Sequence, residues 1–170
     1  HAWPDAITQR IRLVGELLGG ALVRKRSHEE LERQLRFEAM IGELSAALVA
    51  ASSATVPSAI EAGLRRLADF LGADRCSIFE VSRDGARLTL AHAWAAPGVP
   101  VVSEVGLDRQ FPWMAGLVRH GQVLPLAGPD AIPIEANQDR QSWASADGKS
   151  ALLVPALIGG VPRYVLLLAC

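Results

Sequence analysis

The sequence has little cysteine, few aromatic residues and no excess of either charge. Its 170 residues include only two cysteines, Cys76 and Cys170, too few for a disulfide framework or a four-thiolate zinc site. With 17 basic and 18 acidic residues, the chain lacks the basic surface of nucleic-acid-binding and membrane-surface proteins. We therefore expect no nucleic-acid partner, and the scarcity of cysteine favours a cytoplasmic location.

Long hydrophobic runs are also missing, so we expect no membrane contact by this stretch of chain. Half of the residues are nevertheless apolar, which is enough to build a core. The sequence begins at His1 without an initiator Met and ends on Tyr164–Cys170, an apolar segment that predicts a core strand with nothing after it to cover it. We therefore expect an excised piece of a larger protein.

Residues 5–50 are predicted to be helical with a break, and a kink or a change of helix partner is expected near residues 36–40. Apolar residues recur at helical spacing, but Leu35 and Phe37 cannot lie on one line, so the apolar seams before and after them are out of register. One interpretation is a solvated helical linker. The other is a dimerising helix, because a thin apolar seam on a charged helix cannot be buried by the helix alone. The seam residues expected at the dimer contact are Leu18, Leu22, Leu31, Phe37, Ile41, Leu44 and Leu48.

The middle of the chain is predicted to form a helix and then a hairpin. Pro57 suits the first turn of the helix and Gly72 its end. From Asp74 the apolar period changes to two, and Asp84-Gly85 separates the predicted strands 76–82 and 87–94. Alternation predicts that one face of the second strand holds Leu88, Leu90, His92 and Trp94.

The last third combines short elements with a second hairpin. A short third strand is expected at Val101–Val105, a helix at 111–119, a brief edge strand at 122–126 and a short helix within 134–146. Segments 150–158 and 161–169 form the second hairpin around Gly159-Gly160, and their apolar composition predicts central strands. The fold class predicted from these elements is α+β with an antiparallel sheet.

At this point the sequence resembles a GAF domain, the small-molecule sensor module of bacterial signalling proteins and phosphodiesterases. The resemblance covers residues 37–170, and it rests on arrangement rather than on an invariant chemical motif. Its carriers are FEAMIGELSAALV, IEAGLRRLADFLGADRCSIFEV, FPWMAGLVRHGQVLPL and QDRQSWASADGKSALLVPALIGGVPRYVLLL.

The resemblance implies a PAS-related fold with a central antiparallel sheet of about six strands and helices on one side. The ligand pocket of such a fold lies on the other side, under loops and short helices. The helix that closes the family's fold is missing after residue 170, so we expect a C-terminally truncated domain. Residues 1–36 resemble the closing helix of a preceding sensory domain plus an inter-domain linker.

The function implied by this resemblance is regulatory and not enzymatic. We expect a sensor module of a cytosolic signalling protein of the two-component histidine kinase type, which binds an unknown small molecule and relays the event through a homodimeric helix. The alternative is a purely structural dimerisation module with a filled core and no ligand.

Candidate pocket residues follow from the aromatic stretch 107–146 and its neighbours. Large apolar side chains supply walls and a few polar side chains supply contacts, which is the composition of a small-molecule site. Packing alone would explain the tryptophans equally well. The candidates are Trp94, Phe111, Trp113, His120, Arg140, Trp143 and Lys149.

Other chemistry has little support in the sequence. The histidine spacing fits no metal site, and haem is unlikely, with His92 or His120 as the only candidates for its ligand. A covalent bilin is not expected, because no cysteine lies between residues 77 and 169. Cys76 is expected to be an inert core thiol, since alternation places Arg75 on the opposite face of its strand. We therefore expect no catalytic residue and no metal.

Overall fold

The computed structural model describes residues 4–101, 106–146 and 148–170, and they divide into two compact units. The first unit ends at Ala46 and consists of helix; the second runs from Ala47 to Cys170 and contains all the strands. This division lies ten residues after the expected boundary between residues 36 and 37. Each unit is described by itself.

The N-terminal helix, α1, is continuous over Asp5–Ala50, a length of 46 residues. The expected break near residues 36–40 is therefore wrong. The change of seam between Leu35 and Phe37 does not interrupt the helix, because Arg36, which separates them, is a good helix former. A change of helix partner near residues 36–40 stays a prediction. Across the described residues, we find no helix long and apolar enough to cross a membrane.

Helix α2, Val56–Leu71, begins and ends where the sequence predicts. Pro57 lies in its first turn, and Gly72 closes it in the left-handed conformation at φ 69°, with its N–H donating to the Ala68 carbonyl. Leu64 and Ala68 are buried on its inner face, whereas Leu71 is 49% exposed at the helix end.

The sheet is antiparallel and has five strands in the described residues, close to the expected number of about six. The strands are β1 (Arg75–Val81), β2 (Leu88–Ala95), β3 (Leu124–Leu126), β4 (Ala151–Ile158) and β5 (Val161–Ala169). Their order is β2-β1-β5-β4-β3, so the two predicted hairpins lie side by side through β1 and β5. The predicted strand Val101–Val105 falls mostly outside the described residues. Together the sheet and helices form the expected GAF-like α+β fold.

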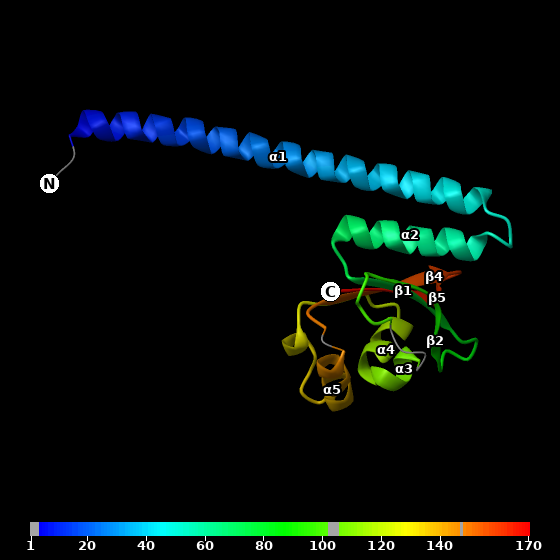
Figure 1. Ribbon diagram of the computed structural model, residues 1–170. Coiled ribbons are helices and arrows are strands. Elements are labelled where there is room, and N and C mark those ends of the chain that lie inside the picture. Colours follow the sequence, from blue (N-terminus) through cyan, green and yellow to red (C-terminus); the bar gives the residue numbers. More distant parts are fainter. Residues whose placement is uncertain (1–3, 102–105, 147) are drawn as a thin grey trace. The chain divides into compact units, whose positions relative to one another are not determined.

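The short elements follow the predictions closely. They are α3 (Leu107–Gln110), α4 (Pro112–Arg119), the 3-10 turn η1 (Pro129–Ala131) and α5 (Asn137–Ser145). Figure 1 shows that α2 covers one face of the sheet, while α3, α4 and α5 lie on the other. Each face has its own buried cluster, as expected for the nearly all-apolar strands β4 and β5.

A bulge in β2 moves half of this strand's side chains to the other face. The register with β1 shifts between Ile78 and Phe79, so Leu90 pairs with Phe79 but Trp94 pairs with Cys76. Leu90 consequently packs with the cluster under α3–α5, and Trp94 packs with the cluster under α2. The prediction that Leu88, Leu90, His92 and Trp94 share one face is therefore wrong, because strict alternation ignores the extra residue.

Candidate functional site

A cavity of about 860 Å³ lies between the sheet and the short helices, on the face opposite α2. This volume is within the range of sites that hold small organic ligands. Strands β1, β4 and β5 supply the floor, helices α3–α5 supply the roof, and the segments 98–101 and 148–150 contribute to the rim.

The floor of the cavity is hollow because two alanines are paired across neighbouring strands. Ala151 on β4 pairs with Ala169 on β5, and Ala169 pairs in turn with Arg75 on β1. Directly opposed residues point to the same face of a sheet, so the two small side chains leave space beside the arginine. The next row contains Leu153 and Leu167, which make the floor apolar.

The roof brings together two of the predicted aromatic residues. Phe111, at the junction of α3 and α4, and Trp143, on α5, both line the cavity. Trp143 is only 6% exposed. Its indole lies against Gly148, where an added Cβ would come within 3.2 Å of the ring atom Cε2, so a larger residue there would have to displace the ring slightly.

One buried carboxylate fixes α5 to the start of α4. Asp139 is 1% exposed, and its two oxygens accept the backbone N–H groups of Trp113 at 3.1 Å and Met114 at 3.0 Å. These N–H groups belong to the first turn of α4 and have no partner within that helix. Asp139 therefore holds together the two helices that carry Met114 and Trp143, both of which line the cavity.

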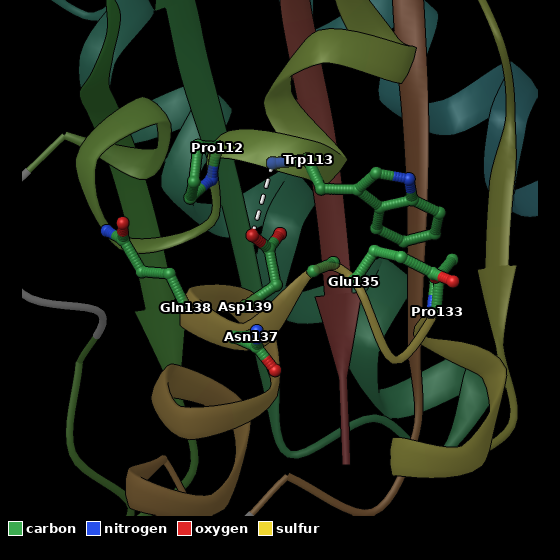
Figure 2. A pocket seen from close by; sticks show the side chains of 8 residues that line it. Pro112, Trp113, Pro133, Glu135, Asn137, Gln138 and Asp139 are labelled. Atoms are coloured by element: carbon green, nitrogen blue, oxygen red, sulfur yellow. Dashed lines mark hydrogen bonds between the residues drawn. The ribbon is translucent and has the colours of Figure 1, made fainter.

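A second, shallower recess of about 410 Å³ lies on the outer side of this junction (Figure 2). Trp113 lines it together with Pro112, Pro133 and Asn137. The predicted pocket residue Trp113 thus belongs to the recess and not to the large cavity, although its neighbour Phe111 lines the cavity.

Of the remaining predicted pocket residues, one lines the large cavity and three lie elsewhere. Lys149 lines the large cavity. Arg140 instead donates to the carbonyl of Ile132 at 2.8 Å, where it holds the loop after η1. His120 bonds through Nδ1 to the Gly116 carbonyl at 2.7 Å at the end of α4, and Trp94 packs on the α2 side of the sheet. The cavity therefore unites Phe111, Trp143 and Lys149.

Several lining residues were not among the candidates. Arg75 is the most informative, since its Nη2 donates to the Ala146 carbonyl at 3.4 Å while its Nε is buried without a hydrogen-bond partner. Alternation from the buried Cys76 was a sufficient signal to place Arg75 on the cavity face. The other polar lining residues come from the position before β1, from α3, from α5 and from the segment after α5, where no periodicity marks them: Asp74, Gln110, Gln141, Ser142, Ser145 and Ser150.

Neither candidate haem ligand lies at this cavity. His92 pairs with Ile78, which packs on the α2 side, and His120 lies outside the lining. Cys76 is fully buried on the α2 side, where burial raises the pKa of its thiol to about 11. Within the described ranges, no three His, Cys, Asp or Glu side chains are grouped as metal ligands would be.

Comparison with known proteins supports the fold but does not establish a family. No protein-family profile and no curated protein sequence matches the chain. Among solved structures, the phycocyanobilin-bound GAF domain of a cyanobacterial phytochrome is similar, with a TM-score of 0.62, 15% identity, and coverage of 78% of each chain. At such low identity the likeness concerns the fold alone.

Two further solved structures are also similar to the chain. The GAF domain of a phosphoenolpyruvate-protein phosphotransferase from Coxiella burnetii gives a TM-score of 0.56 at 18% identity, covering 77% of this chain and 75% of that chain. Residues 122 to 287 of a methyl-accepting chemotaxis protein give a TM-score of 0.56 at 16% identity, with 76% and 81% covered. These likenesses establish a GAF-like fold for the chain.

Proposed function

We propose that residues 47–170 form a regulatory sensor module that binds a small molecule in the large cavity. The observation that carries this proposal is the cavity itself, which combines an apolar floor, two aromatic walls and several polar side chains at the face opposite α2. The purely structural alternative predicts a filled core, so an open space of this size supports the binding proposal over it. The GAF-like fold, found also in the phytochrome and chemotaxis structures, supports a place in signalling.

We propose binding without conversion of the ligand. Ser142, Ser145 and Ser150 line the cavity, but among the described lining residues no histidine accompanies them as a general base. A covalent bilin is not part of the proposal. Cys76 is buried on the opposite face, and Cys170, although it lines the cavity, directs its thiol to the Gly72 carbonyl at 3.6 Å.

The output is proposed to pass through a homodimer of α1 in a cytosolic protein of the sensor histidine kinase type. Leu18, Leu22 and Leu31 each expose more than half of their surface, whereas Phe37, Ile41 and Leu48 expose 38–40% and Leu44 is half-buried. Such apolar side chains on a charged helix favour a partner helix. A ligand would act by binding two arrangements of the dimer with different affinity.

The binding proposal is tested by a fragment screen that monitors thermal unfolding. A ligand present at 100 times its Kd stabilises the folded state by about 2.7 kcal/mol, which raises the Tm by roughly 10 °C for a unit of this size. Ala151→Phe fills the floor of the cavity and should abolish the shift. The matched control is Ala156→Phe on the same strand, where the side chain is exposed and outside the lining.

If no fragment shifts the Tm of the parent chain, the alternative of a dimerisation module is favoured. A fragment that stabilises the parent chain and the Ala151→Phe variant equally would bind elsewhere and would also contradict the proposal.

The dimer is tested separately by light scattering. Ile41→Glu places a charge in the proposed seam and should convert a dimer to a monomer. Ala39→Glu is the control, because Ala39 is also exposed but lies about 160° around the helix from Ile41. A monomeric parent chain, or equal effects of the two substitutions, would contradict the proposed dimer.

A further inference from the structure

Two cationic side chains line the large cavity, and neither forms an ion pair with a described acidic residue. Arg75 and Lys149 both belong to its lining. The ion pairs found among the described residues lie on α1 and α2, and neither cation takes part in one. Asp74 is the single acidic residue described in the lining, and it is exposed. Among the described lining residues, the positive charges therefore outnumber the negative ones.

The guanidinium of the half-buried Arg75 is only partly satisfied. Its Nε is buried and has no hydrogen-bond partner, and its Nη2 makes a long hydrogen bond of 3.4 Å to the Ala146 carbonyl. Arginine presents several N–H donors in a planar fork, and an unpaired buried donor is unfavourable. The hollow left by Ala169 and Ala151 lies in the same row as Arg75, so an acceptor placed there can reach this fork.

A third donor lies in the roof. The Nε1 of Trp143 is buried and has no hydrogen-bond partner, although indole N–H groups usually find one when buried. This nitrogen lies beside Gly148, the neighbour of Lys149 in the sequence: a Cβ added at Gly148 would be 3.5 Å from it. Buried N–H donors without a partner thus occur on both the floor and the roof, and a hydrogen-bond acceptor on a ligand would satisfy them.

The rest of the wall is apolar. Phe111 and Met114 face the cavity from the roof, and Leu153 and Leu167 face it from the floor. A ligand that fills this volume must therefore bury a hydrophobic body as well as present an acceptor group.

We propose that the ligand of this cavity is a small organic acid, in which a carboxylate is bound by Arg75 and Lys149 and a ring-sized apolar body packs against Phe111 and Leu153. The planar fork of arginine matches the two oxygens of a carboxylate, and Lys149 adds a second charge at the rim. The Trp143 N–H supplies a further donor. The inference rests on the proposed function, because it names the class of ligand bound at the same site.

The test compares an acid with its neutral analogue of nearly equal shape, using 2-naphthoate and 2-naphthamide as probes in isothermal titration calorimetry. We expect the acid to bind at least about tenfold more tightly, as charge-assisted hydrogen bonds predict. Arg75→Gln should weaken 2-naphthoate about tenfold and leave 2-naphthamide nearly unchanged. Arg83→Gln, which removes the same charge from an exposed position of the β1–β2 turn, should change neither.

The outcomes separate this inference from the proposed function. Equal affinity for the two probes, with both blocked by Ala151→Phe, would overturn the acid preference and leave the binding cavity standing. Unchanged 2-naphthoate affinity in a folded Arg75→Gln variant would overturn the inference as well. If Arg75→Gln does not fold, Lys149→Gln replaces it, because Lys149 is exposed and its loss should still weaken the acid selectively. If neither probe nor any screened fragment binds, both proposals fail.

Discussion

The buried carboxylate of Asp139 offers the sharpest test of how the roof of the cavity is held. Asp139→Ala removes the acceptor of two backbone N–H groups, at 3.1 and 3.0 Å, from a position that is 1% exposed. An unsatisfied buried donor costs about 1–3 kcal/mol, so two of them should lower the free energy of unfolding by about 3 kcal/mol. For the unit spanning residues 47–170, this corresponds to a fall in Tm of roughly 12 °C.

The assay is urea unfolding followed by circular dichroism, together with thermal unfolding. Asp139→Asn keeps an accepting oxygen for one N–H but turns an amide NH₂ toward the other, so its loss should lie between those of the parent chain and Asp139→Ala. Asp130→Ala is the control, because Asp130 is exposed and its removal should change the free energy by less than about 0.5 kcal/mol. If Asp139→Ala is as stable as Asp130→Ala, the carboxylate does not hold α4 and α5 together.

Three further predictions concern other parts of the second unit. Gly106→Ala should destabilise the fold by about 1–3 kcal/mol, because its Cβ would lie 2.8 Å from a backbone oxygen of β2. A Cβ added at Gly116 has nothing within 4 Å, so Gly116→Ala should instead stabilise the fold by about 0.5–1 kcal/mol. Equal changes in the free energy of unfolding for the two substitutions, measured by chemical denaturation, would refute the steric argument. Burial raises the pKa of the Cys76 thiol from 9.0 to about 11. The contribution of the neutral thiol to the free energy of unfolding should therefore be fully present below pH 9 and decrease as the pH rises toward 11. A Cys76→Ala variant that keeps this alkaline decrease would show that Cys76 does not cause it. The Ser82 hydroxyl is the largest cause that lowers the pKa of Asp84, so the stability contributed by this carboxylate is present above the usual carboxyl pKa and is lost in acid. Carbonyl NMR should show a higher pKa of Asp84 in Ser82→Ala, still below the usual value because the backbone N–H of Ala86 and the charge of Arg87 remain, and an unchanged pKa would refute this cause.

Periodicity and turn residues were sufficient to predict the scaffold of the second unit. The apolar faces of α2 and the strands, with Asp84-Gly85 and Gly159-Gly160 between them, predicted both hairpins. Gly159 and Gly160 have φ values of 62° and 80°, the conformation that a tight hairpin turn requires. Such elements depend on local patterns, which a single sequence displays.

The candidate site was predicted less completely because it depends on contacts between distant segments. A single extra residue in β2 turned Trp94 toward α2, and no local pattern marks such a bulge. Arg140 and His120 satisfy nearby carbonyl groups, which residue type alone does not distinguish from ligand binding. The hollow beside Arg75 arises from the register of three strands, β1, β5 and β4, which only the fold defines.

The central claim, that the large cavity binds a small molecule, is tested most directly at the indole N–H of Trp143. This group is buried without a hydrogen-bond partner, so its NMR signal, assigned with Trp143→Phe, should move markedly when a ligand fills the cavity. The indole signal of Trp113, which lines the outer recess, should move much less. A ligand-dependent shift of the Trp143 signal that disappears in Ala151→Phe is the predicted result. A Trp143 signal that no ligand moves, or that moves no more than the signal of Trp113, would contradict the account.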